Sequence, residues 1–423
     1  MIKELTIEKT SLPVGWEMKK IDEVVIDYHQ GLNTAGQKIK FVDEGYPIIQ
    51  TRNLNQGEID ISSKIKFMSK VDWELYKDKY KPSVGDVFLT NIGTIGKTAV
   101  VTIEEDYLIH WNIFIFKLDK SKVLPLYLKL FLDSPSSFDY YHSFQKGGTV
   151  SFITKKMISN LEIPLPPITQ QKKIVAILDK AFAAIDTAKA NAEQNLQNAK
   201  ELFESYLQNV FENKGDDWEE KTLGKVTSKI GSGATPRGGK ASYKEEGISL
   251  IRSMNVHDFY FKKKNLAFID DKQADALSNV TLQEKDVLLN ITGASIARCC
   301  MIPKEYLPAR VNQHVSIIRA KKDIINPVFL ASLLTSKYFK DQILEIGEQG
   351  ATRQAITKVQ LENFHISYPK EIEKQEKVIQ NINLIKAETK KLEAIYTQKI
   401  ADLEEMKKSV LQKAFSGQLN TIN

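Results

Sequence analysis

The chain has 423 residues, of which 42% are hydrophobic and 26% are charged, and its formal net charge at pH 7 is +6. This length accommodates two globular domains of ordinary size together with connecting helices. No apolar run reaches the ~18 residues that a membrane-spanning helix needs, and the start Met1–Glu4 lacks the apolar region of a signal peptide. We therefore expect a cytoplasmic protein without membrane contact.

Composition also argues against two kinds of site. The only cysteines, Cys299 and Cys300, are adjacent, so neither a disulfide framework nor a cysteine-based zinc site is predicted. The six histidines are scattered along the chain, with no pair at metal-ligand spacing. A net charge of +6 is too small to hold a polyanion by bulk charge alone, so any nucleic-acid binding must come from locally arranged residues.

Short apolar runs rich in β-branched residues predict strands in the first part of the chain. They cover Tyr46–Arg52, Asp86–Asn91, Thr98–Ile103 and Ile113–Lys117, and a helix is expected over Leu126–Leu132. Pro164, Pro166 and Pro167 close this segment. The sequence therefore predicts a first mixed α/β domain over residues 1–168.

The pattern then changes to that of a long helix. From Gln170 to Asn213 there is no Pro or Gly, and apolar or small residues recur every three or four positions from Ile174 to Val210. This spacing is typical of a coiled-coil seam with one stutter. The 44 residues would span roughly 66 Å, and the segment 169–214 is predicted as a central long helix.

The second half repeats the first at an offset of about 202 residues. Trp16-Glu17 returns as Trp218-Glu219, and Gly45–Ile49 returns as Gly247–Ile251. Strands are accordingly predicted over Ile248–Arg252, Asp286–Ile291, Ala297–Ile302 and Val315–Arg319. We expect a second domain over 215–372, and a C-terminal long helix and tail over 373–423 whose seam is broken at Thr389. The two opening tryptophans are predicted to anchor the cores.

The expected fold class is α+β. Two similar mixed α/β domains are separated by two long antiparallel coiled-coil helices in a pseudo-twofold tandem repeat. The second helix must return beside the first if a twofold relates the copies. A nearly twofold surface suits a nearly twofold partner, of which duplex DNA is the commonest.

Three segments resemble catalytic or cofactor-binding motifs, but each lacks a residue that its motif requires. Asn91–Thr98 resembles the end of a phosphate-binding loop but has Asn where that loop needs Gly. Gly231–Pro236 begins like a dinucleotide fingerprint and ends in Pro. Leu165–Ile168 lacks the amide and the aromatic ring with which amino-methyltransferases hold a flipped base. The sequence therefore predicts no active site in this chain.

Several motifs, taken in order, resemble one known family. They are Pro166-Pro167 leading to Gln170–Ile174, then Gly233–Pro236 followed by Gly247–Ile251, and finally Val410–Leu419. With the layout of domain, long helix, domain and long helix, they resemble the DNA-specificity (HsdS) subunit of type I restriction-modification systems over essentially the whole chain. The first copy has Gly31–Gly36 in place of Gly-Ala-Thr-Pro, so its entry loop should differ in shape.

The resemblance implies that each domain is a target-recognition domain that reads one half of a split, asymmetric sequence in double-stranded DNA. It further implies that the helical rod sets the spacing and docks two methyltransferase subunits. Catalytic residues, metal and cofactors are then expected outside this chain. S-adenosylmethionine would bind the methyltransferase subunits, and ATP and Mg the restriction (translocase) subunits.

Candidate DNA-binding residues follow from the groups that read base edges and contact phosphates. For the first domain they are Gln50, Arg52, Asn53, Lys97, Trp111, Asn112, Lys146 and Thr149. For the second they are Arg252, Asn255, Arg298, Asn312, Gln313, His314, Thr352 and Arg353. The copies differ at equivalent positions, since Gln50 aligns with Arg252, and Arg52 with Met254. Distinct half-sites require such differences.

Some alternatives remain open at this stage. Asn53 and Asn255 fit turn formers as well as base readers, and Arg319 fits a strand-end surface charge. Six of the seven arginines follow the first domain, which predicts a G·C-containing half-site for the second domain and an A·T-leaning one for the first. Rival functions are the specificity subunit of a related type IIB-like enzyme, a coiled-coil protein-binding scaffold, and an enzyme with an unrecognised site.

Overall fold

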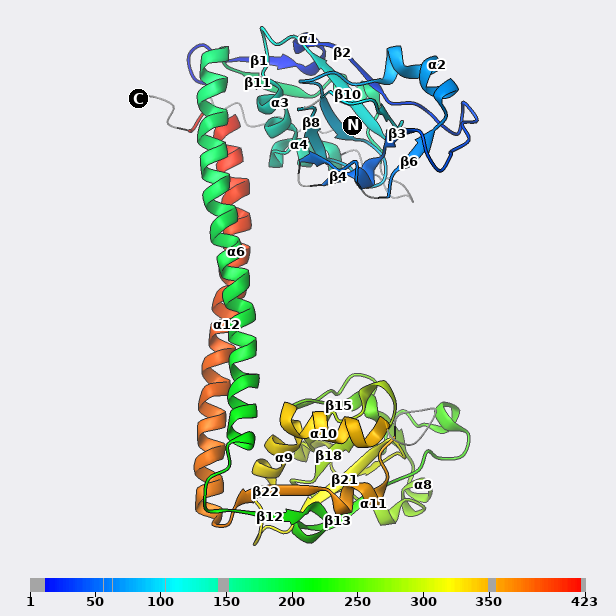
Figure 1. Ribbon diagram of the computed structural model, residues 1–423, viewed down its shortest axis with the longest axis vertical. Helices are drawn as coiled ribbons and strands as arrows, with labels where there is room; N and C mark the ends of the chain where they lie inside the picture. The colour runs from blue at the N-terminus through cyan, green and yellow to red at the C-terminus, as the bar shows by residue number, and fades with distance from the viewer. Residues whose placement is uncertain are drawn as a thin grey trace. The chain divides into compact units, whose positions relative to one another are not determined.

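The computed structural model describes residues 12–143, except 56, 63 and 103, together with residues 152–348 and 355–419 (Figure 1). The chain divides into two compact units. Unit 1 comprises Met1–Ala192 with Gln398–Asn423, and unit 2 comprises Glu193–Thr397. Each unit therefore contains one globular domain and the adjoining parts of two long helices.

Unit 1 is built on a four-stranded antiparallel sheet in the order β2-β10-β7-β8. Its strands are β2 (Val25–Gln30), β10 (Ile113–Leu118), β7 (Val87–Thr90) and β8 (Thr98–Val100). A second sheet has the order β6 (Lys66–Met68), β3 (Tyr46–Ile49), β9 (Leu108–Ile109), and in it β3 and β9 run parallel. Two strand pairs complete the domain: β1 (Glu17–Lys20) with β11 (Glu162–Leu165), and β4 (Leu54–Asn55) with β5 (Glu58–Ile59).

Among the residues that the structure describes in unit 1, five short helices pack around these sheets. They are α1 (Ile21–Val24), α2 (Lys70–Tyr80), α3 (Pro125–Leu132), α4 (Pro135–Ser143) and α5 (Lys155–Ser159). Helix α3 packs on β7 and β8, and its Tyr127 and Phe131 also contact Phe415 of the last long helix (Figure 1). The core of the domain is therefore continuous with the helical part of unit 1.

Unit 2 repeats this topology. Its four-stranded sheet has the order β13 (Thr227–Ser232), β21 (Val315–Ala320), β18 (Val287–Asn290), β19 (Cys299–Met301). The second sheet is β17 (Ala267–Ile269), β14 (Ile248–Ile251), β20 (Ala309–Val311), with β14 and β20 parallel. The strand pairs are β12 (Trp218–Thr222) with β22 (His365–Pro369), and β15 (Val256–His257) with β16 (Tyr260–Phe261). The helices are α7 (Leu223–Val226), α8 (Asp271–Asp275), α9 (Pro327–Thr335), α10 (Lys337–Glu348) and α11 (Lys358–Asn363).

The matching sheet orders confirm the tandem repeat and the α+β fold. All eight predicted strands coincide with observed ones, although several are shorter than predicted. The run Tyr46–Arg52 was predicted as one strand, but β3 ends at Ile49 because Thr51–Asn53 forms a 3₁₀ turn. The same break separates β14 from the turn Ser253–Asn255.

The two long helices are continuous. Helix α6 covers Ile168–Glu212 and α12 covers Ile372–Phe415. Within unit 1 they run antiparallel, because Asp186 pairs with Lys407 at 2.9 Å while Lys189, one turn later, pairs with Glu404 at 2.7 Å. In unit 2 the seam position Thr389 is buried, and its hydroxyl donates to the carbonyl of Lys386 in its own helix. The polar break in the seam therefore leaves no unpaired hydroxyl.

The core of each domain includes the end of a long helix. In unit 1, Leu411, Ala414 and Phe415 of α12 are buried in the core that contains Trp16. In unit 2, Leu207 and Phe211 of α6 belong to the core, and Phe211 packs edge-on against Phe329 and Trp218. Burial confirms Trp16 as a core anchor, whereas Trp218 is partly buried and packs against the core of unit 2. Each fully buried phenylalanine contributes about 1.5–3 kcal/mol of hydrophobic stabilisation.

A buried glutamine fixes the start of each long helix. Gln171 accepts from the Leu124 N–H at 2.9 Å and donates to the carbonyls of Lys122 and Pro166 at 2.8 and 2.9 Å. Gln375 repeats the pattern in unit 2, accepting from the Asn326 N–H at 2.7 Å and donating to Ile324 and Pro369. Both glutamines are fully buried. Each one pairs three backbone groups, at the helix start and in the loop before α3 or α9, that would otherwise be buried without partners.

We predict that Gln171→Ala lowers the free energy of unfolding by about 3 kcal/mol, because it leaves three buried backbone groups unpaired. Urea denaturation of the full chain measures this loss. Gln194→Ala is the matched control, since Gln194 is exposed on the same helix and bonds only Asn198. Its effect should stay within ~0.5 kcal/mol. Equal effects of the two substitutions would contradict the anchoring role.

Candidate DNA interface

The carboxyl ends of two parallel strands meet in each unit, and the candidate residues lie in the segments that follow them. In unit 1, β3 and β9 pair with Ile49 opposite Ile109, and the His110 N–H donates to the Ile49 carbonyl at 2.9 Å. In unit 2, β14 and β20 pair with Ile251 opposite Val311, and the Asn312 N–H donates to the Ile251 carbonyl at 3.0 Å. Segments about 60 residues apart in sequence are thereby joined.

In each unit, two further segments are hydrogen-bonded to the residues that follow the second parallel strand. In unit 1 the Asn91 N–H donates to the Asn112 carbonyl, and the Trp111 N–H donates to that of Leu32, both at 3.0 Å. In unit 2 the Ile291 N–H donates to the His314 carbonyl at 3.0 Å, and the Gly233 N–H donates to the Asn312 carbonyl at 3.1 Å. We call these assemblies the loop edges. They comprise residues 30–33, 50–55, 91–97 and 110–112 in unit 1, and 232–235, 252–257, 291–298 and 312–314 in unit 2.

A glycine permits the close approach in both copies. A Cβ atom on Gly31 would lie 2.1 Å from the Ile109 carbonyl oxygen, and one on Gly233 would lie 1.9 Å from that of Val311. No side chain fits at either position without moving the backbone. Gly31 and Gly233 thus have the same role, although the loops that follow them differ in sequence.

Asn53 and Asn255 are turn formers in this structure. Each is almost fully buried, and its Oδ1 accepts from the backbone N–H of Gln50 or Arg252 at 3.1 Å. The Asn255 amide also donates to the Lys262 carbonyl at 2.9 Å. Since both side chains face the protein, the structure favours the turn-forming alternative over base reading.

Lys97 and Arg298 occupy equivalent positions but differ in their contacts. Lys97 Nζ donates to the Leu54 carbonyl at 2.9 Å and also reaches the Thr51 carbonyl and Asn55 Oδ1, each at 3.5 Å. Arg298 is half-buried, and its guanidinium has no hydrogen-bond or ion-pair partner among the described residues. Lys97 thus holds the adjacent turn, whereas Arg298 is available to a partner.

Three of the five arginines that the structure describes in unit 2 already bond protein groups. Arg252 donates to the Asn265 carbonyl and lies over the Tyr243 ring, with 5.2 Å from guanidinium to centroid. Arg310 is buried and donates to the Ala274 and Ala309 carbonyls. Arg319 makes two 2.8 Å bonds to the buried Asp286, so the surface-charge interpretation of Arg319 was wrong. Counting arginines therefore overstates how many can face DNA.

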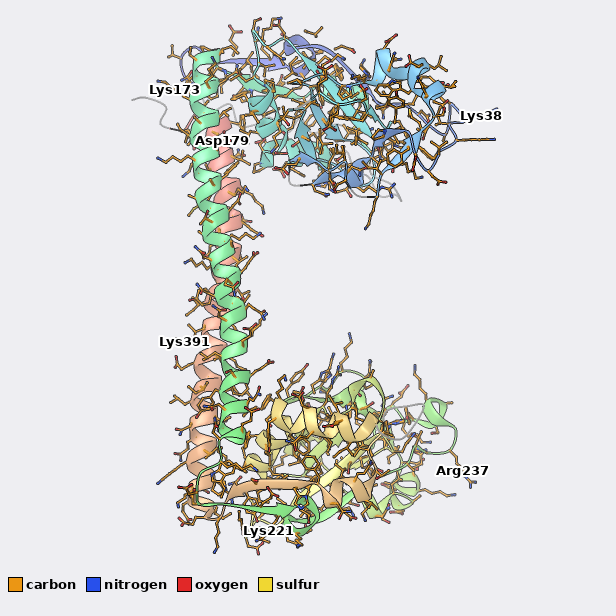
Figure 2. The ribbon with its side chains drawn as sticks, viewed as in Figure 1. Lys38, Lys173, Asp179, Lys221, Arg237 and Lys391 are labelled. Atoms are coloured by element: carbon orange, nitrogen blue, oxygen red, sulfur yellow. The ribbon has the colours of Figure 1, made fainter. Side chains whose placement is uncertain are left out.

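Arg52, Trp111 and Gln313 are exposed on their loop edges, and Gln50 is half-buried. Asn112 is half-buried and its Oδ1 lies 2.8 Å from His110 Nδ1, while Asn312 is buried and its Oδ1 accepts from the His314 N–H at 3.1 Å. The predicted residues Lys146, Thr149, Thr352 and Arg353 lie outside the described residues. Figure 2 shows two exposed cations that sequence reasoning did not select, Lys38 and Arg237, pointing away from their domains.

A histidine network supports each loop edge. His110 Nδ1 bonds Asn112 Oδ1 at 2.8 Å, and its Nε2 lies 3.2 Å from the Thr34 hydroxyl. In unit 2, His314 lies 2.6 Å from the Thr292 hydroxyl and 3.1 Å from the Gln313 amide, which in turn accepts from Thr235. The two threonines Thr34 and Thr235 were not predicted. Comparing the entry loops of the two copies would have found them, because each follows its loop glycine closely.

We predict that acidification weakens unit 1 through His110. Burial lowers the pKa of His110 below its ordinary value of about 6.5, and nearby Lys66 lowers this pKa further. As the pH falls below about 6.5, the unfolded chain gains a proton that the folded protein does not bind, so stability falls until the folded pKa is reached. Between pH 7.5 and 5.5, melting curves should show a larger decrease in melting temperature for the native chain than for His110→Gln. Parallel losses would contradict this assignment.

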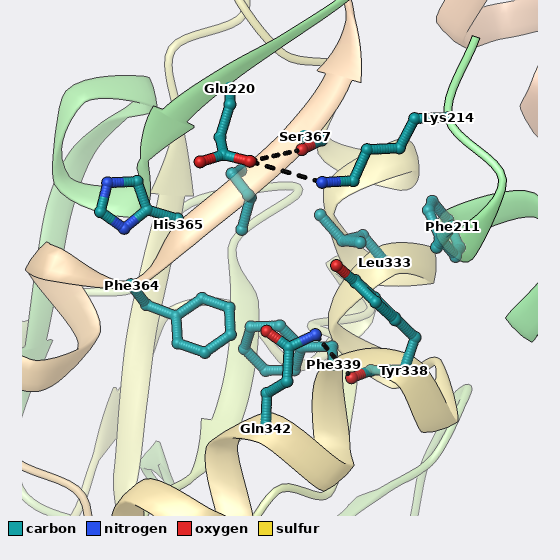
Figure 3. Close-up of a pocket in the computed structure, with 11 residues that line it drawn as sticks. Phe211, Lys214, Glu220, Leu333, Tyr338, Phe339, Gln342, Phe364, His365 and Ser367 are labelled. Atoms are coloured by element: carbon teal, nitrogen blue, oxygen red, sulfur yellow. Dashed lines mark hydrogen bonds and ion pairs between the residues drawn. The ribbon is translucent and has the colours of Figure 1, made fainter.

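Unit 2 also contains a pocket apart from the loop edge (Figure 3). Its apolar wall includes Phe211, Leu333 and Phe364, and Lys214 pairs with Glu220 at 3.4 Å at its polar side. Ser367 donates to the same carboxylate at 3.4 Å. In the part of the chain that the structure describes, no group of acidic, histidine or cysteine side chains is arranged to hold a metal ion. None of its helices could cross a membrane.

Comparison with known proteins agrees with this arrangement. The model of the type I restriction modification DNA specificity domain matches the chain twice, over residues 13–198 and 215–405. The type I restriction enzyme MjaVIII specificity subunit of Methanocaldococcus jannaschii is 25% identical, over 97% of this chain and 95% of its own length.

Two solved structures share the fold. The HsdS subunit of Thermoanaerobacter tengcongensis superposes with a TM-score of 0.62 and 17% identity, covering 96% of this chain and 98% of that one. A chain from a structure that describes complex assembly and conformational transition of the type I R-M system gives a TM-score of 0.73 and 18% identity, covering 96% and 99%.

Proposed function

This chain belongs to the type I restriction modification DNA specificity family, and we propose that the loop edge of each unit reads one half of a bipartite, asymmetric DNA target. The chain is a sequence-recognition subunit. The observation that carries the proposal is that one scaffold is built twice and presents different side chains at equivalent positions. Such a pair reads two different half-sites with the same backbone geometry.

The available side chains of the loop edges have the chemistry of base and backbone contacts. Arg52 and Arg298 are cations without protein partners among the described residues. Trp111 and Gln313 are exposed on the same loop edges, and the Gln313 amide also bonds Thr235 and His314. Arginine bonds the O6 and N7 atoms of guanine, and glutamine bonds adenine. Lys38 and Arg237 fit phosphate contacts, which position the protein without reading sequence.

The long helices are proposed to set the spacing of the half-sites and to dock two methyltransferase subunits. Their continuity through α6 and α12 supports this role, since an unbroken helix transmits position over its whole length. Methyl transfer is assigned to those partners with S-adenosylmethionine, and cleavage to restriction (translocase) subunits with ATP and Mg. The relative from Methanocaldococcus jannaschii is named as the specificity subunit of a type I restriction enzyme, which supports the recognition role of this chain.

Methylome sequencing tests the proposal. DNA from a strain without native methylation is compared after expression of the methyltransferase subunit alone and together with this chain. We expect a split motif, methylated on both strands, that appears only with this chain. A well-formed complex with an active methyltransferase and no new motif would rule out the recognition role.

A further inference from the structure

The same 3₁₀ turn follows the parallel strand in both units. It covers Thr51–Asn53 in unit 1 and Ser253–Asn255 in unit 2. The residue before it has φ −117° and ψ 168° in the first copy and φ −121° and ψ 163° in the second. In both, the Asn N–H donates to the carbonyl three residues earlier at 2.8 Å, and the Asn Oδ1 accepts from the N–H of that residue at 3.1 Å. The two turns are therefore one structure built from different residues.

Each turn is also held by a different donor, from Lys97 just before β8 in unit 1 and from Asn290 of β18 in unit 2. Lys97 Nζ reaches the Thr51 carbonyl at 3.5 Å and the Leu54 carbonyl at 2.9 Å in unit 1. Asn290 Nδ2 donates to the Ser253 carbonyl at 2.9 Å in unit 2. Because Thr51 and Ser253 are equivalent positions, both copies secure the first carbonyl of the turn. A turn held this way fixes the direction of its side chains.

Only the middle residue of each turn points outward. The residue before it, Thr51 or Ser253, is half-buried, and the residue after it, Asn53 or Asn255, is buried. In contrast, Arg52 is exposed and Met254 is 40% exposed. The Arg52 guanidinium has no hydrogen-bond or ion-pair partner among the described residues. An otherwise identical turn thus presents a cation in one unit and an apolar side chain in the other.

We propose that this middle residue is a specificity-determining position, with Arg52 reading a guanine in one half-site and Met254 contacting a thymine methyl group in the other. The proposal rests on the proposed function and names the residue and base that carry it. A guanidinium donates two bonds to guanine O6 and N7, and an apolar side chain discriminates by contact with the thymine methyl. The middle residue then differs between the units, as Arg52 and Met254, because the two half-sites differ.

At this turn the assignment differs from the expectation that arginine counts gave. That expectation placed guanine in the half-site of unit 2, but Arg252, Arg310 and Arg319 bond protein groups. Arg298, which has no protein partner among the described residues, lies outside the turn. Arg252, which precedes the turn, bonds the Asn265 carbonyl and lies over Tyr243, so we assign it a positioning role for the turn. The free arginine of the turn is in unit 1.

The test uses the full chain assembled with its methyltransferase, and it measures methylation of DNA libraries randomised at each position of the two half-sites. Arg52→Ala should lower discrimination at one G·C position of one half-site by roughly 5- to 150-fold, and leave the other half-site unchanged. Met254→Ala should relax one A·T position of the other half-site about fivefold. Lys38→Ala is the control, because loss of a phosphate contact weakens methylation of all sequences alike.

Arg52→Lys distinguishes base reading from a phosphate contact, since lysine keeps the charge and loses the two-bond geometry. We expect Arg52→Lys to relax the same G·C position. If Arg52→Ala and Arg52→Lys both leave the motif unchanged in an intact complex, or if Arg52→Ala weakens all sites equally, the inference fails while the bipartite motif of the native chain upholds the proposed function. Absence of any motif with the native chain would instead remove the proposed function itself.

Discussion

Parallel pairing of β3 with β9, and of β14 with β20, is the constraint on which each loop edge depends. It places two distant segments at one end of the same sheet, where backbone bonds from His110 and Asn312 join them to the preceding strand. The close approach requires Gly31 and Gly233, since any Cβ there would collide with a carbonyl. In the proposed function, the identity of a few outward side chains on this fixed backbone decides what each edge binds, and the rest of the domain holds them in place.

The domains depend on the long helices in turn. Phe415 and Phe211 are buried in the domain cores, and Gln171 and Gln375 bond the loops that lead into α3 and α9. A shift of a helix end therefore disturbs the core against which the four-stranded sheet packs. This coupling suits the proposed docking of partner subunits on the helices, because the position of each domain on its helix is set by packing and hydrogen bonds together.

The sequence alone predicted the repeat, the long helices and three of the four strands in each four-stranded sheet, because these depend on local periodicity. The edge strands β2 and β13 were not predicted. The sequence predicted less about the site. Asn53 and Asn255 have the side chain that reads adenine, yet the same amide completes a turn, and only burial separates the two roles. Lys97 and Arg298 align, but tertiary contacts decide that Lys97 bonds carbonyls and Arg298 does not. The helix-anchoring Gln171 and Gln375 are equivalent in the repeat, and comparing the copies for shared polar residues would have identified them.

The most direct test is the structure of the assembled methyltransferase complex on its methylated target DNA. The account predicts that both loop edges face the DNA, with Arg52 and Met254 at base edges and Gln171 and Gln375 still bonded inside their units. DNA bound to another face of the domains, with both 3₁₀ turns exposed to solvent, would contradict the claim that one scaffold, built twice, reads the two half-sites.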